Sequence, residues 1–247
     1  TDVYGVKVER EPVDECFKYI VQLIDEACEG EMLPTFVLDP ASDYGRITKP
    51  IALSLKAKVL VTAASPLFNG NNDQATLKNH DGTPLFDATF RPEKWDSAMV
   101  ACKEAIDLCH EAGIMLYEYE DAAKRYTDTT VMDLTLRNAF TLRNNIEVIW
   151  ANTQMVSIPG NGGMIHASMP KLNPSYVNSN DICKWLGMPI KIAEMFYTEN
   201  GVPLDEDINR NVGDLYNLRT AQSKDKLYIR QGRTTVDMHF DREPRFY

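Results

Sequence analysis

Apolar residues recur at helical spacing in three long segments of the first half of the chain. The first segment predicts a helix over Pro12–Glu29 that stops at Gly30, and the second predicts a helix from Thr48 to Ser65. The third predicts a helix that begins at Pro92 and stops at Gly113. Proline fits the first turn of a helix, where its missing N–H costs nothing, and glycine readily adopts the left-handed conformation that ends a helix. The pattern therefore predicts three well-delimited helices.

The segment from Thr48 to Ser65 is apolar around most of its circumference. Thr48 is placed to cap the helix, and Pro50 falls in its first turn. Such a wide apolar surface implies burial against more than one neighbour, and its alanines let neighbouring helices approach closely. Pro66 disfavours the α conformation at Ser65 and ends the helix there.

Beyond these three segments the periodicity weakens. We expect a shorter fourth helix over Asp133–Leu142, an extended buried segment or strand over Glu147–Ala151, and an amphipathic helix over Pro189–Glu199. Two further strand segments are expected at Leu227–Ile229 and Val236–Phe240. The chain therefore divides into a helical region, residues 1–144, and a loop-rich region, residues 145–247, which we expect to share one structural domain.

The spacing of the helices suggests a repeat. The first two predicted helices start about 36 residues apart, close to the roughly 34-residue step of a tetratricopeptide repeat. Trp95 early in the third helix, followed by Ala98 and Ala105, also resembles the packing positions of that repeat. The expected fold class is therefore mainly α: a tetratricopeptide-like helical scaffold with long loops and a few short strands.

Composition excludes two classes of partner. The chain has 247 residues, 44% of them hydrophobic, and a formal net charge of −10. Such a chain can bury a sizeable core, but its charge would repel nucleic acid and anionic membrane surfaces. No apolar stretch approaches the roughly 20 residues that a membrane-spanning helix needs.

Metal and disulfide chemistry find little support in the sequence. The five cysteines contain no C-x-x-C pair, and their odd number excludes a complete disulfide framework, so we expect buried, unpaired thiols. The four histidines are scattered and lack zinc-ligand spacing. The oxygen-rich segment Asn69–Asp73 could suggest a calcium loop, but it lacks the spacing of an EF-hand. We therefore expect a solvated turn there and no cofactor, with a structural calcium ion as the alternative.

Six segments resemble, in order along the chain, motifs of one protein family. The helix Pro12–Glu29 resembles the family's "PVxExxxxIxxDLxEA" helix, and residues 45–70 resemble "GRATKGAALALKARVLLYAASPLFNG". The other four are residues 92–98 (like "PEKWEKAA"), 145–149 (like "NKEVIF"), 197–203 (like "YytkNGlPi") and 241–247 (like "NRDPRFY"). The family that these segments resemble is SusD/RagB, the surface nutrient-binding lipoproteins of Bacteroidetes-type bacteria.

The resemblance implies a fold, a place and a role. Family members have a tetratricopeptide-like helical scaffold whose loops and small strands form the ligand face. They are held at the cell-surface side of the outer membrane by a lipid anchor, which would lie outside this chain. They cap a SusC-like TonB-dependent transporter and hold oligosaccharides, or peptides in RagB-like members, for import without catalysis. Both ends of this chain look like cuts through a longer protein, so we expect it to be the middle of a full-length member, truncated at both ends.

A sugar-binding site needs aromatic side chains that stack on pyranose rings, with polar groups nearby to hydrogen-bond the hydroxyls. Such groups are expected on loops that a rigid scaffold positions. The loop-rich stretch from Met155 to Gly187 fits best. Its candidate ligand-binding residues are Trp185, Tyr176, Asn178, Asn180 and Asp181. Trp95 and Trp150 are instead expected in the core, because each lies within an apolar segment.

Three functions remain open at this stage. The first is a non-catalytic glycan-binding protein that delivers oligosaccharides to the transporter. The second is a peptide-binding RagB-like member or a tetratricopeptide-type scaffold that binds a protein partner. The third is an accessory protein with weak glycosidase activity, but the clustered acids Glu118, Glu120 and Asp121 carry no sign of the burial that raises the pKa of a catalytic acid. We therefore expect no enzyme.

Overall fold

The computed structural model describes residues 8–37, 39, 41–153 and 186–247. The chain forms two compact units, the first of residues 1–117 with 144–153 and the second of residues 118–143 with 154–247. The helix α4, Asp128–Thr141, belongs to the second unit. The sequence predicts a boundary between two regions at residue 144. At this residue the chain leaves the second unit and returns to the first. The described part of the chain is mainly helical, as the sequence predicts.

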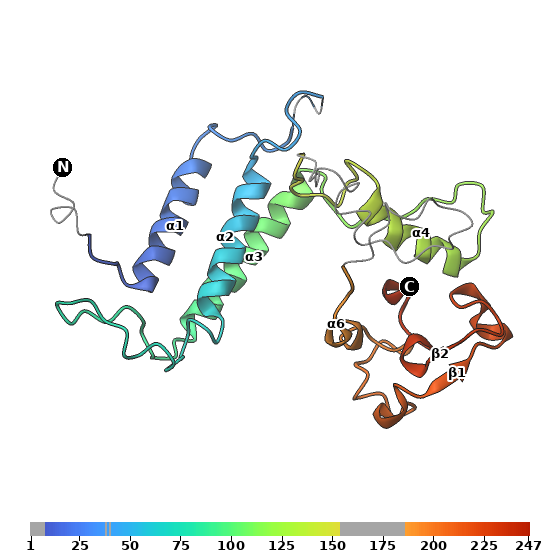
Figure 1. Ribbon diagram of the computed structural model, residues 1–247. Coiled ribbons are helices and arrows are strands. Elements are labelled where there is room, and N and C mark those ends of the chain that lie inside the picture. Colours follow the sequence, from blue (N-terminus) through green and yellow to red (C-terminus); the bar gives the residue numbers. More distant parts are fainter. Residues whose placement is uncertain (1–7, 38, 40, 154–185) are drawn as a thin grey trace, which may run out of the picture. The chain divides into compact units, whose positions relative to one another are not determined.

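Three long helices build the first unit: α1, Val13–Cys28, α2, Lys49–Ala64, and α3, Glu93–Glu111. They run side by side, with α2 in contact with both of the others (Figure 1). Ala57 of α2 packs with Ala101 and Ala105 of α3, and all three are buried. These small side chains let the two helices approach closely, so the alanine-rich pattern of α2 is explained by packing.

The three helices begin and end close to the residues predicted to cap or stop them, with one exception. Thr48 occupies the N-cap position of α2 and is buried, but its side chain makes no capping hydrogen bond. Pro50 lies in the first turn, and the extended backbone of Ser65 ends the helix before Pro66. Gly113 has a φ of +77°, the left-handed conformation expected of a helix stop.

Two tryptophans expected in the core are exposed. Trp95 is 44% exposed, on the flank of α3 beside the face that packs on α2. Trp150 is 57% exposed, and the segment Glu147–Ala151 forms turns and bends instead of the predicted strand. Hydrogen bonds from the backbone N–H groups of Glu147 and Val148 to the side chain and the carbonyl of Asn145 explain this, because they fold the segment back on itself.

The second unit contains α4, a short helix and one small sheet. The strands β1, Leu218–Thr220, and β2, Thr234–Val236, are antiparallel, with Leu218 opposite Val236. The predicted strands were misplaced: Leu227 closes a 3₁₀ turn, η3 (Ser223–Leu227), and a second one, η4 (Asp237–His239), follows β2 directly. Two other 3₁₀ turns are η2, Val212–Asp214, and η5, Pro244–Phe246.

The two α-helices that the structure describes in this unit differ in length from their predictions. α4 begins five residues earlier than expected, because the Thr127 hydroxyl accepts a hydrogen bond from the Thr130 N–H and caps it. The helix α6 covers only Ile190–Glu194, not Pro189–Glu199. Ala193 is buried, whereas Ile190, Ile192 and Met195 are exposed, so little of the expected apolar face is covered.

A buried arginine organises the carboxyl-terminal segment. Arg242 is 3% exposed, and its guanidinium donates to the carbonyl oxygens of Ala193, Phe196 and Met238 at 2.6–2.9 Å and to that of Tyr197 at 3.2 Å. Its guanidinium carbon also lies 4.4 Å from the centroid of the Phe246 ring. The carbonyl groups that follow α6 therefore turn toward Arg242, which explains why the helix stops early.

The described cysteines are unpaired, as expected, but not all are buried. Cys109 is buried, Cys28 and Cys102 are half-buried, and Cys16 is exposed. Burial raises the pKa of the Cys28 thiol, which keeps it protonated at neutral pH. The prediction of buried thiols is thus wrong for Cys16, which lies on the flank of α1 that faces away from its packing partner.

Candidate functional site

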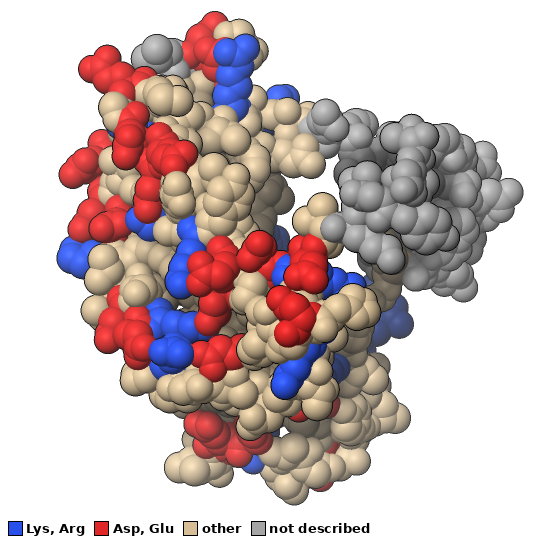
Figure 2. All heavy atoms as spheres, turned by 90° about the vertical axis from the view of Figure 1, so that its left-hand side faces the viewer, with Lys and Arg blue, Asp and Glu red and all other residues tan. Residues whose placement is uncertain are grey.

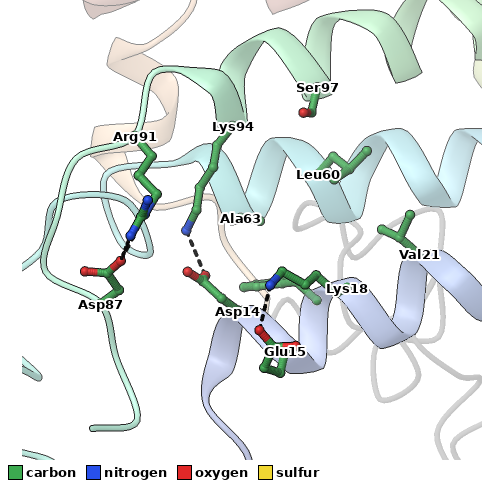
Figure 3. A pocket seen from close by; sticks show the side chains of 11 residues that line it. Asp14, Glu15, Lys18, Val21, Leu60, Ala63, Asp87, Arg91, Lys94 and Ser97 are labelled. Atoms are coloured by element: carbon green, nitrogen blue, oxygen red, sulfur yellow. Dashed lines mark hydrogen bonds and ion pairs between the residues drawn. The ribbon is translucent and has the colours of Figure 1, made fainter.

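A hollow in the described structure lies between the three helices of the first unit (Figure 3). We call it the α1–α3 hollow. Its volume is about 550 Å³, within the range of roughly 300–1,000 Å³ typical of small-molecule sites. It is lined by Asp14, Glu15, Phe17, Lys18, Val21, Leu60, Ala63, Asp87, Arg91, Lys94 and Ser97.

Apolar side chains from α1 and α2 line part of this hollow. Phe17 and Val21 are one turn apart on α1, and Leu60 and Ala63 are one turn apart on α2, so each pair lies on one helix face. The ring of Phe17 also meets the ring of Phe68 edge-on, with 5.1 Å between their centroids. The ring contact joins α1 to the turn that follows α2, and the four lining side chains give the hollow an apolar wall.

A half-buried ion pair bridges the first turns of α1 and α3. The Lys94 ammonium is 2.7 Å from Oδ1 of Asp14 and also donates to the Phe68 carbonyl at 3.1 Å. The two side chains point toward each other across the hollow, and that of Lys94 is only 17% exposed. Because Asp14 lies in the first turn of α1, the helix dipole also favours its negative charge.

A second pair lies at the loop end of the hollow. Arg91 donates through Nε and Nη2 to Oδ2 of Asp87, at 3.0 and 2.7 Å, and the Thr89 N–H donates to Oδ1 at 2.9 Å. The Thr89 N–H first, and then the Arg91 guanidinium, lower the pKa of Asp87 to about 2. A carboxyl group with such a pKa is ionised at neutral pH and is a poor proton donor for catalysis.

The chemistry of this hollow suits an uncharged polar ligand. A third pair, Lys18 with Glu15 at 2.6 Å, is largely exposed, so three positive and three negative side chains balance around the hollow. Ser97 donates to the carbonyl of Glu93, and no histidine is among the lining residues, so the lining offers no serine–histidine pair. Charged edges beside an apolar wall can hydrogen-bond and cover a neutral molecule.

Acid should weaken the loop end of the hollow, because folding holds the pKa of Asp87 below its ordinary value. The contribution of this carboxylate is complete above about pH 4, where an unfolded aspartate is ionised, and is lost as the pH falls through about 2. We expect the side-chain carboxyl carbon of Asp87 to titrate with a midpoint near 2 in an NMR pH series. In an Arg91→Met variant the midpoint should rise only in part, because the Thr89 N–H remains. A wild-type midpoint at the ordinary value for aspartate would contradict this arrangement.

The site residues predicted from the sequence, Trp185, Tyr176, Asn178, Asn180 and Asp181, lie outside the described residues and stay predictions. The α1–α3 hollow was missed, because it combines side chains from four separate segments. One signal was available: Asp14 and Lys18 are one turn apart on α1, on the flank of the face that carries Phe17 and Val21.

The loop expected to be a solvated turn or a calcium site is held by its own hydrogen bonds. The buried side chain of Asn69 donates to the carbonyls of Ala64 and Arg91 and accepts from the Arg91 N–H at 2.7 Å. The Asn71 side-chain oxygen accepts from the Asp73 N–H at 2.8 Å. The side-chain oxygens of Asn69 and Asn71 thus accept hydrogen bonds from backbone N–H groups of the protein. Within the described ranges, no cluster of three or more His, Cys, Asp or Glu side chains has the geometry to hold a metal ion.

Charged side chains of both signs are interspersed on the face of the molecule shown in Figure 2. Acidic groups predominate there, in line with the net charge of −10. Glu118 and Glu120 are exposed, and Asp121 accepts a hydrogen bond from the Tyr126 N–H. Among the helices that the structure describes, none combines the length and the apolar character needed to cross a membrane.

Comparison with known proteins reveals a shared fold. No protein-family profile and no curated protein matches the chain. The solved structure of BT4246, a Bacteroides thetaiotaomicron protein, superposes with a TM-score of 0.75 at 23% identity, over 98% of this chain and 42% of that one. Its selenomethionine form gives a TM-score of 0.73 at 24% identity, over 100% of this chain and 44% of that one. This chain thus spans less than half the length of these structures, and the likeness is one of fold.

Proposed function

We propose that this chain is part of a non-catalytic, surface glycan-binding protein of the SusD/RagB type. The observation that carries the proposal is the set of six motifs in register between Pro12 and Tyr247. The mainly helical fold agrees with the helical scaffold of that family. In this proposal the three helices α1, α2 and α3 form part of a tetratricopeptide-like scaffold, and the protein hands oligosaccharides to a SusC-like TonB-dependent transporter.

Several residues of the six motifs make hydrogen bonds or ion pairs that hold elements of the fold together. Asn69 of the "SPLFNG" segment ties the end of α2 to the start of α3, and Lys94 of the "PEKW" segment pairs with Asp14. Arg242 of the carboxyl-terminal motif gathers four backbone carbonyls. These positions support the fold, so the resemblance rests on residues whose substitution the fold would tolerate poorly.

The cellular location follows from the same proposal. A surface glycan-binding protein of this type is held at the outer membrane by a lipid anchor, which would lie outside this chain. The balanced charges and the apolar wall of the α1–α3 hollow suit neutral oligosaccharides, as does the absence of a serine–histidine pair from its lining. No cofactor is needed for binding of this kind.

Trp185 is the predicted stacking residue of the loop-rich region, so its replacement tests the proposed ligand face. In affinity electrophoresis through gels that contain starch, xylan, mannan or β-glucan, the wild-type chain should be retarded by at least one polymer. Trp185→Ala should weaken that retardation about tenfold, because a stacked aromatic ring contributes on the order of 1 kcal/mol beyond its buried area. Trp95→Ala is the matched control and should migrate like the wild type. Equal retardation of both variants would remove Trp185 from the site.

Binding of a peptide or a protein partner is the second candidate, and a surface feature of α3 favours it. Trp95, Met99 and Ile106 are exposed and lie along one flank of the helix. Apolar side chains at such spacing can anchor a partner. A tryptic digest of casein is a suitable probe: retention of defined peptides, lost in Met99→Asp, together with no response to the polymers, would favour this alternative. Release of reducing sugar from the polymers would instead indicate glycosidase activity.

A further inference from the structure

Trp150 is held at the surface by its own N–H group. Its indole Nε1 donates to the Gly45 carbonyl at 3.1 Å, although the two residues are far apart in the sequence. The side chain is nevertheless 57% exposed. Because the only polar group of the indole is used within the protein, a molecule that approaches Trp150 meets the apolar ring.

A hollow of about 150 Å³ lies beside this ring. We call it the Trp150 hollow. Its volume is close to that of an engineered cavity of about 150 Å³ that accepts a benzene ring. Its lining comes from four segments of the first unit: residues 35–37, 44–51, 112–114 and 148–151.

Aromatic and polar groups surround the Trp150 hollow. Phe36 is 57% exposed, and Tyr44 is half-buried. Arg46 also lines the hollow, with its side chain largely exposed and Nη1 placed 3.1 Å from the Asp43 carboxylate. The lining of this hollow thus combines exposed aromatic carbon with a guanidinium group, which is the combination that a pyranose needs.

Gly45 fixes the carbonyl that holds Trp150. Its φ is +92°, and a Cβ at this position would lie 2.9 Å from Cγ2 of Thr153. A side chain would therefore both strain the backbone and collide with the segment that carries Trp150. The structure thus pins the indole from a backbone position that only glycine occupies without strain.

We infer that Trp150 and Phe36 form a stacking site for one pyranose ring of a glycan, with Arg46 hydrogen-bonding its hydroxyl groups. This inference rests on the proposed glycan binding and assigns it a contact site that differs from both the predicted Trp185 loop and the α1–α3 hollow.

Fluorine NMR of the wild-type chain tests the site without any substitution at it. The chain contains three tryptophans, Trp95, Trp150 and Trp185, so labelling with 5-fluorotryptophan gives three resonances, which Trp→Phe variants assign. We expect titration with hexasaccharides of glucose, xylose and mannose to shift the Trp150 resonance in a saturable way for the sugar that binds, while Trp95 stays unchanged. A saturable shift at Trp185 with none at Trp150 would overturn the inference and leave the proposed function standing. No saturable shift at any tryptophan, together with no binding heat, would instead contradict the proposed function.

A second experiment measures the affinity of substituted variants for the hexasaccharide that binds. We expect Trp150→Ala and Phe36→Ala each to weaken binding of that hexasaccharide several-fold to about tenfold, with Trp95→Ala as the matched control at wild-type affinity. Gly45→Ala should also weaken binding, because it displaces the carbonyl that orients the indole. Wild-type affinity in both Trp150→Ala and Phe36→Ala, with binding by the wild type established, would overturn the inference.

Discussion

Replacement of Arg242 by methionine is expected to destabilise the second unit by about 3–5 kcal/mol, because several backbone carbonyl groups lose a charged donor, at a cost of about 1–3 kcal/mol for each that is left unsatisfied. Methionine fills much of the space but donates no hydrogen bond. The carbonyl groups of Ala193, Phe196, Tyr197 and Met238 would then be left without their present donor. Arg242→Lys should also destabilise, because one ammonium cannot serve the four acceptors that a planar guanidinium reaches.

Hydrogen exchange read by mass spectrometry in increasing urea is the suitable measurement, because it reports peptides of residues 186–247 separately from α1, α2 and α3. The matched control is Arg245→Met, three residues further on, where the arginine is exposed and paired with Glu243. It should change stability by no more than about 0.5 kcal/mol. Equal protection of the second unit in Arg242→Met and Arg245→Met would show that the buried arginine does not organise this segment.

Asn69→Ala is expected to destabilise the first unit by about 2–3 kcal/mol, the cost of leaving buried polar groups unpaired. The Asn69 side chain joins the Ala64 carbonyl, at the end of α2, to the N–H and carbonyl of Arg91, just before α3. Its loss would free the long connection between the two helices. It would also disturb Arg91 and Lys94, which line the α1–α3 hollow.

The midpoint of urea unfolding, again followed by hydrogen exchange of α2 and α3 peptides, measures this effect. Asn72→Ala is the matched control, because it removes an exposed asparagine of the same loop and should be close to neutral. If Asn69→Ala left the midpoint unchanged, the hydrogen bonds of Asn69 would not be what connects α2 to α3.

The helices that lie between clear start and stop residues could be predicted from the sequence. α2 lies between Thr48 and Ser65-Pro66, and α3 lies between Pro92 and Gly113, and in both cases the backbone chemistry of proline or glycine decides the ends. α6 could not be predicted in the same way. Its pattern suits an amphipathic helix, but contacts with Arg242, more than 40 residues away, divert its carbonyl groups.

Burial was harder to predict than helix position. Trp95 and Trp150 stand in apolar segments, but an apolar pattern does not say which flank of an element meets a neighbour. Ala98, Ala101 and Ala105 occupy the contact with α2, so Trp95 on the adjacent flank stays exposed. Trp150 lies in a segment of turns and bends, and its indole Nε1–H donates to the Gly45 carbonyl while the ring stays 57% exposed.

The α1–α3 hollow depends on pairs that no local spacing reveals. Asp14 and Lys94 are 80 residues apart in the chain, and their contact follows from the packing of α1 and α3 on α2. By contrast, residue type alone was enough to propose which aromatic side chains contact sugar. It was not enough to predict how those side chains are arranged in space. Local chemistry therefore predicts elements, whereas a site built between elements needs the fold.

We propose that this chain binds glycans without transforming them. Isothermal titration calorimetry of the 247-residue chain with hexasaccharides of glucose, xylose and mannose, followed by chromatography of the recovered sugars, tests both parts of this proposal. We expect saturable binding heat with at least one sugar and recovery of that sugar at unchanged length. Absence of binding heat with every sugar, or recovery of shortened products, would refute the proposal.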